Sequence, residues 1–534
     1  MKNIALIQPS RRFTRSDTND LFGSATLPYG VGVLASSLKN NFPDINTQII
    51  DFNRLVYLNN GLPKFDKTEL ALLDQYLEGL RSNAQIDFHS LSSEEKRITK
   101  NLFLKYFDDI AAVGFTIMSQ SALRSSYLLA MICKWYNEDI QIIFGGPFIV
   151  LAQASSPEAI AEILHTVDFL CIQPDGPAAL NGIADHLFHG APIQGTPGII
   201  YRENGQVVTS ASDDSHIESE PPASFAGLSL RQYTDSNGAC WLPYRFSRGC
   251  SQNCSFCSHR SVSRLEYKSI SKITAEIDQL RKEYDSNHFL FYDSAINNNP
   301  KLLEAFCDHF AGSDLKWKSY AITNHITEAL LRKMKRSGCD FVSWGIESTD
   351  NTILRSINKP FDGRQALSTI KTAAKCGINQ KCSFIIGWPF EKTTTIIDVA
   401  RDAAAIKMKY GCIVEVCPLK LVRASPLFYN PDNFKIKLID QIGPTLFTRE
   451  NIHYEEIGGL DESAVLQRRW LHSWYFQREI VRKTQSWPLR LPRLLSLYRR
   501  IRRTFDPKYK QLSKLRKWFD ELYFVALGRT KRIS

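Results

Sequence analysis

Short apolar runs alternate with amphipathic stretches over the first 200 residues of the chain. The runs NIALIQP, NTQIIDFN, AAVGFTIM, IQIIFGG and VDFLCIQ are apolar and rich in β-branched residues, which is typical of strands buried on both faces. Between them, GVGVLASSLKNN and RSSYLLAMICKWYNED carry apolar residues at helical spacing. This alternation predicts a parallel sheet covered by helices, interrupted by a polar, helix-prone insert over residues 62–107.

A hairpin and a linker follow this first region. The segment GIIYRENGQVVTS places Asn-Gly between two strand-like runs, which predicts a tight β-hairpin. The next segment, SDDSHIESEPPASFAG, is acidic and rich in Pro and Ser, and this composition is typical of a linker.

Strand–helix alternation then resumes as far as residue 425. Candidate strands are LPYRFSRGC, HFLFYDSA, KSYAIT, FVSWGIES, QKCSFIIGWP and CIVEVCPLK. Six such units predict a partial (β/α)6 barrel of the TIM type, in which chemistry takes place at the carboxyl ends of the strands. We therefore expect a Rossmann-like (flavodoxin-like) α/β domain over 1–200, a linker over 201–239, the barrel over 240–425 and a mostly helical extension over 426–534.

Composition and charge are those of a globular protein with a basic tail. The 43% hydrophobic and 23% charged residues argue against a disordered chain. No run reaches the roughly 18 apolar residues of a membrane helix, and no signal-peptide pattern opens the chain, so we expect a cytoplasmic protein. The net charge of +11 comes from residues 461–534, where nineteen Lys and Arg face six Asp and Glu. Such a tail suits an acidic partner or substrate, or simply forms solvated helix faces.

Three of the 12 cysteines stand close together in the segment SRGCSQNCSFCSHR. Cys250, Cys254 and Cys257 follow the first barrel strand with the spacing CxxxCxxC. Thiolates are the usual ligands of iron–sulfur clusters, and three of them leave one iron of a four-iron cluster open to a small molecule. A structural zinc site needs a fourth ligand, and His259 lies only two residues after Cys257, which is a cramped spacing. The other cysteines stand singly in apolar runs and imply no disulfide framework.

The segment RGCSQNCSFC, with an aromatic residue before the last cysteine, resembles the cluster motif of the radical S-adenosylmethionine (radical SAM) enzymes. The resemblance implies a [4Fe–4S] cluster whose free iron binds the amino and carboxylate groups of S-adenosylmethionine. It also implies an external one-electron reductant of the flavodoxin or ferredoxin type, and release of a 5′-deoxyadenosyl radical.

Two later segments, GIESTD and FIIGWP, resemble family segments that line the S-adenosylmethionine site. With the cluster loop and the end of the second barrel strand, they imply these cofactor-contacting residues: Phe256, Asp293, Ser294, Glu347, Ser348 and Gly387. Phe256 is expected near the adenine, and Gly387 would let the adenosine approach the backbone. Two alternatives stay open, since Phe256 can anchor its loop and the Ser-Thr-Asp run can cap a helix.

Placed before such a barrel, the N-terminal domain resembles the cobalamin-binding domain of one radical SAM subclass. Open parallel sheets bind ligands beyond the carboxyl ends of their strands. The residues implied there are Thr116, Ser119, Ser121, Gly145 and Gly146, although ordinary turn chemistry explains them as well. No DxHxxG motif follows the first strand, so cobalamin would bind without a histidine ligand, and we interpret His89 as a surface residue. QPDGP stands where relatives usually have a Gly-Glu-rich loop.

The resemblance favours a cobalamin-dependent methyltransferase that acts on an unactivated carbon of a natural-product or peptide substrate. One alternative is a cobalamin-independent or non-methylating radical reaction such as epimerisation, cyclisation or ring contraction. Epimerisation needs a hydrogen donor, for which Cys382, Cys417 and Tyr320 are candidates, although buried packing is the usual role of a free cysteine. A further alternative is an iron–sulfur or zinc protein that binds nucleic acid through its basic, aromatic tail.

Overall fold

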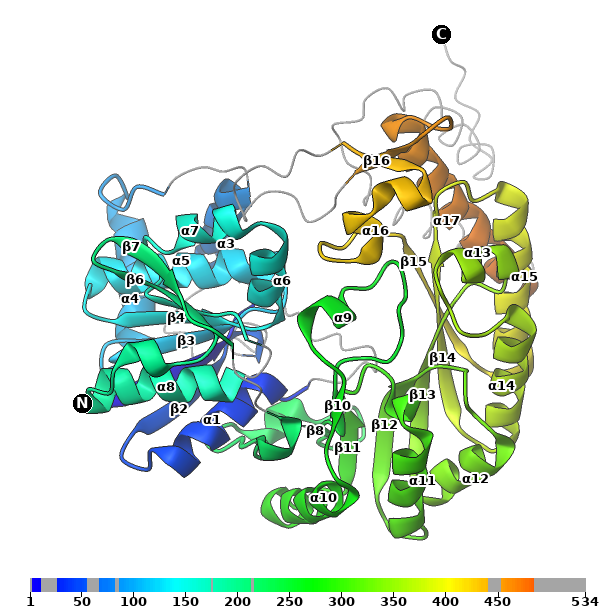
Figure 1. Cartoon of the computed structure of the whole chain (residues 1–534), viewed down its shortest axis with the longest axis horizontal. Helices are drawn as coiled ribbons and strands as arrows, with labels where there is room; N and C mark the ends of the chain where they lie inside the picture. The colour runs from blue at the N-terminus through cyan, green and yellow to red at the C-terminus, as the bar shows by residue number, and fades with distance from the viewer. Residues whose placement is uncertain are drawn as a thin grey trace.

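The computed structural model describes residues 2–10, 26–54, 67–81, 86–173, 176–212, 216–439 and 453–484. Two α/β units lie side by side, and the segment after the second unit reaches back toward the first (Figure 1). Short 3₁₀ helices lie in the loops at Ile193–Gly195, Ile217–Ser219, Leu230–Tyr233, Ile296–Asn298 and Pro431–Phe434.

The first unit is built on a seven-stranded sheet of order β2-β1-β3-β4-β5-β6-β7. The strands are β1 (Asn3–Gln8), β2 (Asn46–Asp51), β3 (Ala112–Thr116), β4 (Gln141–Gly145), β5 (Phe169–Cys171), β6 (Ile199–Glu203) and β7 (Gln206–Thr209). The first five are parallel in the flavodoxin-like order, as predicted. The predicted hairpin is β6–β7, turning at Asn204 and Gly205 with φ of 51° and 80°, and it extends this sheet through antiparallel pairs.

Helices cover both faces of this sheet. One face packs against α1 (Tyr29–Asn41) and α8 (Gly176–His189). The other packs against α3 (Lys67–Arg81), α4 (Ser93–Tyr106), α5 (Gln120–Tyr136), α6 (Pro147–Ser155) and α7 (Pro157–Ile163). The described part of the polar insert is thus helical, as predicted, and α4 begins with a capping box between Ser92 and Glu95.

The second unit is a partial barrel of six parallel strands in the order β15-β14-β13-β12-β11-β8. The strands are β8 (Leu242–Tyr244), β11 (His288–Phe291), β12 (Lys316–Ala321), β13 (Cys339–Glu347), β14 (Asn379–Ile386) and β15 (Ile413–Pro418). The helices are α10 (Ile270–Tyr284), α11 (Pro300–His309), α12 (Glu328–Arg336), α13 (Asn351–Ser356), α14 (Gly363–Lys375) and α15 (Thr393–Tyr410). They pack outside the barrel (Figure 1). The core between the strands and these helices includes Trp317 and Trp344.

The segment after the barrel joins the two units. It contains α16 (Pro426–Tyr429), the antiparallel pair β16 (Ile436–Leu438) and β17 (Tyr454–Glu456), and α17 (Glu462–Thr484). Helix α17 packs along α15 and adds Phe476 to the barrel core. Arg423 Nη1 donates to Ser156 Oγ at 3.0 Å, and the Tyr429 hydroxyl donates to the Ala154 carbonyl at 3.1 Å. These two hydrogen bonds connect the post-barrel segment to the first unit.

Most of the predicted basic tail, residues 485–534, lies outside the described residues. Among the helices that the structure describes, none is long and apolar enough to cross a membrane.

Candidate active site

The loop with the three cysteines leaves the barrel after β8 and is closed at its base. Strands β9 (Ser247–Arg248) and β10 (Glu266–Tyr267) pair antiparallel, and the Arg248 guanidinium binds the Glu266 carboxylate at 2.6 Å. Gly249 precedes Cys250 at φ +86°, and a Cβ there would lie 2.6 Å from the Arg264 carbonyl oxygen. The turn into the cysteine loop therefore requires glycine.

The three thiols influence one another electrostatically. Burial raises the pKa of Cys254 to about 11. The positive charge of Lys359 opposes this rise, and the other two thiols add to it. Burial likewise raises the pKa of Cys257, with a contribution from Cys250. All twelve cysteines are free thiols.

No three His, Cys, Asp or Glu side chains in the described ranges converge closely enough to hold a single metal ion. His259, the candidate zinc ligand, begins α9 (His259–Val262) and places Nδ1 3.4 Å from Ser294 Oγ. In a cluster the thiolates bind different irons, so they stand farther apart than the ligands of one ion do.

The amide group of Asn298 also fits a cluster at this loop. Its Oδ1 lies 4.0 Å from Cys250 Sγ, and its buried Nδ2 has no hydrogen-bond partner. A buried donor without an acceptor is costly, and a metal-bound thiolate at Cys250 would be an acceptor.

A buried ion pair lies next to the cysteine loop. Lys359 Nζ donates to Glu347 Oε1 at 3.1 Å and to the Gly345 carbonyl at 3.1 Å, and it lies 5.6 Å from the centre of the Phe256 ring. Burial lowers the pKa of Lys359, but Glu347 and Cys254 raise it further, so the net shift is upward and the amine stays charged. Glu347 itself adopts φ +65°, a strained conformation for a residue with a side chain. Sequence reasoning missed Lys359, because one lysine in INKPF follows no periodic or motif pattern.

Phe256 of the cysteine loop packs edge-on against Trp388, with ring centres 5.5 Å apart. The cysteine loop and the GWP segment after β14 therefore meet, as the resemblance implied. The cap alternative for the segment after β13 is also confirmed, because Asp350 accepts from the Thr352 and Ile353 amides and begins α13. Ser348 accepts from the Asp350 amide at 3.1 Å, and its contact with S-adenosylmethionine stays a prediction.

Gly387 lies beside α17, and its contact with adenosine stays a prediction. It adopts φ +80°, and a Cβ there would lie 2.6 Å from Cγ of Arg469 on α17. Its amide and that of Trp388 donate to Glu391 Oε2 at 2.5 and 3.2 Å. The lack of a Cβ at this position makes room for the Arg469 side chain.

Asp293 holds the start of the cysteine loop. Its fully buried carboxylate accepts from the Phe246 and Ser247 amides at 3.0 and 2.8 Å, and from Ser247 Oγ at 2.5 Å. This carboxylate is engaged by hydrogen bonds within the protein, and both Asp293 and Ser294 line the cavity described next.

A cavity of about 770 Å³ lies between the two units. The first unit contributes residues at the carboxyl ends of its parallel strands: Gln8, Asp51, Thr116, Gly145 and Cys171. The barrel contributes residues from its mouth and from the cysteine loop: Arg245, Gly249, His259, Tyr292, Ser294 and Tyr320. Open parallel sheets bind ligands at the carboxyl ends of their strands, and barrels carry their active sites at the same ends of theirs. Here both of these places line one cavity.

Three of the five residues implied for cobalamin line this cavity, namely Thr116, Gly145 and Gly146. A Cβ on Gly146 would meet the Ile117 backbone at 2.8 Å, and one on Gly145 would meet Cys171 Cβ at 3.2 Å, so both glycines serve close packing. Ser119 and Ser121 do not line the cavity. Ser119 instead caps α5 by accepting from the Ala122 amide at 3.3 Å and lies 3.1 Å from Ser121 Oγ.

The cavity is large enough for a large ligand. None of the described residues that the first unit contributes to its lining is a histidine. Its volume lies toward the upper end of the range for ligand sites. A Cβ on Gly30, in α1, would meet only Thr116 Cγ2 at 3.8 Å, so this wall is open. Among the lining residues that the structure describes, His259 is the one histidine, and it comes from the cysteine loop. His89 is exposed and packs edge-on against Trp135 at 4.6 Å.

A buried ionic cluster joins the first unit, the linker and the barrel at the cavity wall. Glu220 of the linker accepts from the Tyr29 hydroxyl at 2.9 Å and from Arg245 Nε at 3.1 Å. Lys268 Nζ lies 4.0 Å from the same carboxylate and 2.9 Å from that of Glu276. The sequence placed Glu220 in an acidic linker and gave it no partner, so this cluster was not predicted.

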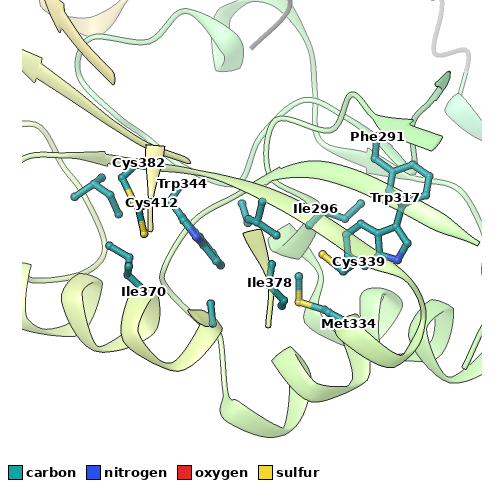
Figure 2. Close-up of a cluster of buried hydrophobic side chains, with 14 of the residues drawn as sticks. Phe291, Ile296, Trp317, Met334, Cys339, Trp344, Ile370, Ile378, Cys382 and Cys412 are labelled. Atoms are coloured by element: carbon teal, nitrogen blue, oxygen red, sulfur yellow. The ribbon is translucent and has the colours of Figure 1, made fainter. Parts of the chain in front are cut away.

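The three candidate hydrogen donors have different surroundings. Cys382 is fully buried on the helix-facing side of β14, and its thiol hydrogen-bonds with that of Cys412 (Figure 2). It therefore cannot face a substrate, and the structure contradicts this candidate. Tyr320 lines the cavity, and Cys417 is exposed.

Most of the barrel is similar to a known protein family. Residues 244–403 match the family model described as the radical SAM superfamily. An uncharacterized methyltransferase of Pyrococcus horikoshii is 29% identical over 58% of this chain and 67% of its own. Cytidylyl-2-hydroxyethylphosphonate methyltransferase of Streptomyces wedmorensis is 31% identical over 27% of this chain, but only 28% of its own length is matched.

Solved structures match over nearly the whole chain. The radical S-adenosylmethionine methyltransferase TsrM from Kitasatospora setae, solved with cobalamin and a [4Fe–4S] cluster, gives a TM-score of 0.61 at 13% identity. The alignment covers 90% of this chain and 89% of TsrM. The cobalamin-dependent radical enzyme OxsB gives a TM-score of 0.62 at 15% identity and covers 98% of this chain and 72% of its own. At these identities the likeness establishes a shared fold.

Proposed function

We propose that the chain, whose residues 244–403 match the radical SAM superfamily, is a cobalamin-dependent radical SAM methyltransferase that transfers a methyl group to an unactivated carbon. The observation that carries the proposal is the single cavity shared by the carboxyl edge of the first sheet and the barrel mouth. A methyl carrier and a radical source must both reach one substrate carbon, and this arrangement lets them do so.

When bound, the cluster with S-adenosylmethionine supplies the radical that takes hydrogen from the substrate, and cobalamin supplies the methyl group. The chain's own residues hold and orient these groups. Cys250, Cys254 and Cys257 would bind three irons, and Asp293 fixes the start of their loop through three hydrogen bonds. Phe256 of that loop packs edge-on against Trp388 and anchors the loop to the segment after β14.

The first unit would hold cobalamin on its strand ends, where Gly30 and Thr116 face open cavity. The two halves are kept at a fixed separation by Glu220, which binds Tyr29 on one side and Arg245 on the other. The substrate would enter between them as a natural product or peptide.

The test is to purify the full chain without oxygen from cells supplied with cobalamin, and to measure iron, cobalamin and 5′-deoxyadenosine formed with dithionite. We expect about four irons and one cobalamin per chain. The variant with Cys250, Cys254 and Cys257 all changed to Ala should lose iron and 5′-deoxyadenosine but keep cobalamin. Cys376→Ala, a partly exposed thiol at the end of α14, is the matched control. Iron without cobalamin in the unchanged protein would contradict the proposal.

A non-methylating radical reaction is the second candidate, favoured by Tyr320, which lines the cavity at the end of β12. Tyr320→Phe removes the phenolic hydrogen atom. It would abolish an epimerisation but leave methyl transfer possible.

The proposal also covers the substrate class, the reductant and the cellular location of the protein. A small-molecule or peptide substrate and an external one-electron reductant are part of it, as is a cytoplasmic location. The predicted contact of the basic tail with an acidic partner, or with nucleic acid, concerns residues outside the described ranges.

A further inference from the structure

Three consecutive asparagines, Asn297, Asn298 and Asn299, connect β11 to α11, and two of them have complete structural roles. Asn297 Nδ2 donates to the Ile322 and Asn324 carbonyls at 2.9 and 2.8 Å, and its Oδ1 accepts from the Ile322 amide at 3.1 Å. Asn299 caps α11 by accepting from the Leu302 amide at 3.2 Å. These hydrogen bonds fix the backbone on both sides of Asn298.

Asn298 is held against the cysteine loop. Its Oδ1 accepts from Ser251 Oγ at 2.8 Å and lies 4.0 Å from Cys250 Sγ. Gln252 Nε2 in turn donates to Ser251 Oγ at 2.7 Å. The amide nitrogen of Asn298 is buried and makes no hydrogen bond. The side chain is thus anchored beside Cys250 with its donor unused.

The orientation of this amide depends on the state of the sulfur. A protonated thiol donates, so it favours the carbonyl oxygen of the amide. A metal-bound thiolate only accepts, so it repels that oxygen and attracts the N–H groups. Rotation of the amide by half a turn exchanges the two atoms without moving the backbone, and the Ser251 hydroxyl can then accept instead of donate.

We propose that Asn298 donates an N–H···S hydrogen bond to the cluster-bound Cys250 thiolate and thereby raises the reduction potential of the cluster. The inference rests on the proposed function, because it needs the cluster. Cys250 already accepts from the Gln252 backbone amide at 3.4 Å, so Asn298 would be a second donor. Reduction adds negative charge, donors to the sulfurs stabilise the more negative state, and the potential rises. Asn298 is a positioning residue that acts through Cys250.

The experiment compares one substitution at adjacent positions. Asn298→Ser removes the donor, since a serine is too short to reach Cys250. Asn299→Ser keeps an equally good helix cap and is the matched control. The cluster is reconstituted in both variants and in the unchanged chain, and its potential is measured by redox titration followed by electron paramagnetic resonance. We expect Asn298→Ser to lower the equilibrium constant for reduction about tenfold, which is 59 mV for one electron. Asn299→Ser should leave it unchanged.

A second variant guards against an indirect effect on folding. Asn298→Asp keeps the shape but places a negative acceptor beside the sulfur, so its potential should fall at least as far as that of Asn298→Ser. Equal potentials in the unchanged chain and in Asn298→Ser, at equal iron content, would overturn this inference and leave the proposed function standing. Equal shifts in Asn298→Ser and Asn299→Ser would overturn it as well. Absence of any cluster from the unchanged chain would instead overturn the proposed function.

Discussion

Tyr29, in the first turn of α1, donates its hydroxyl to Glu220 at 2.9 Å, across a separation of 191 residues. Glu220 belongs to the linker and also pairs with Arg245 at the end of β8, so one carboxylate connects three parts of the chain at the cavity wall. This buried anion therefore helps to fix the geometry between the first unit and the barrel at the cavity wall.

Removal of that anion should destabilise the protein strongly. Glu220→Ala leaves the Arg245 guanidinium without its carboxylate, and breaking a buried pair costs about 3–5 kcal/mol. Tyr29→Phe removes one hydrogen bond and should cost about 1 kcal/mol. The free energy of unfolding, from chemical denaturation, gives both values. Glu203→Ala is the control, because that carboxylate accepts from Gln194 at the surface. Equal effects of Glu203→Ala and Glu220→Ala would contradict this prediction.

The Lys359–Glu347 pair should behave as a coupled unit. Lys359→Met leaves the Glu347 carboxylate, 8% exposed, without its cation, and should cost about 3–5 kcal/mol. Adding Glu347→Gln removes the unpaired charge, so the double variant should be more stable than the sum of the two single changes predicts. A double-mutant cycle on the free energy of unfolding measures this coupling. Additive effects would show that the two charges do not interact.

Asp51 should make stability depend on pH. Burial raises the pKa of Asp51 from 3.8 to about 6. The hydrogen bond that Asp51 accepts from the Tyr233 hydroxyl offsets part of this rise. The folded state then holds a proton that the unfolded state has released, so this group's contribution to stability falls as pH rises through 6. Between pH 5 and pH 7.5 the loss should be about 1.4 kcal/mol, equivalent to one pKa unit.

Asp51→Asn keeps the side-chain shape without a titrating group. The difference in unfolding free energy between this variant and the unchanged chain should therefore shift in favour of the variant from pH 5 to pH 7.5. A constant difference would mean that Asp51 does not titrate in this range.

Gly30→Leu should exclude cobalamin and spare the cluster. Gly30 lies in α1 and faces the cavity, where a Cβ would have only Thr116 Cγ2 within 4 Å, at 3.8 Å. A leucine side chain would project into the space that the cofactor needs. Cobalamin content after purification should fall at least tenfold while iron content stays the same. Gly195→Leu is the control, since a Cβ at that position meets nothing within 4 Å and the residue is exposed.

The order of elements could be predicted from the sequence because it depends on local periodicity. Both sheets, the hairpin at Asn204 and Gly205, and the meeting of Phe256 with the GWP segment follow from patterns of a few residues. The three candidate cluster ligands were equally accessible from the sequence, since three thiols in eight residues are rare by chance, and their role stays a prediction.

Contacts between distant segments were not predictable in this way. Glu220 lies in a stretch whose composition is that of a solvated linker, yet it is 3% exposed because Tyr29 and Arg245 surround it. Gly387 resembled a ligand-contacting glycine, and only the position of α17 shows that Arg469 fills the space beside it. Cys382 failed as a hydrogen donor because the side of a barrel strand that a residue faces depends on register, which the sequence did not determine.

The hydrogen bonds from Arg423 to Ser156 and from Tyr429 to Ala154 tie the first unit to the segment that follows the barrel, and Glu220 ties it to the segment that precedes the barrel. The two walls of the cavity therefore cannot move apart without breaking hydrogen bonds on one side or the other. If the proposed cobalamin binds in this cavity, any exchange that needs the walls to separate should be slow compared with the passage of a small substrate.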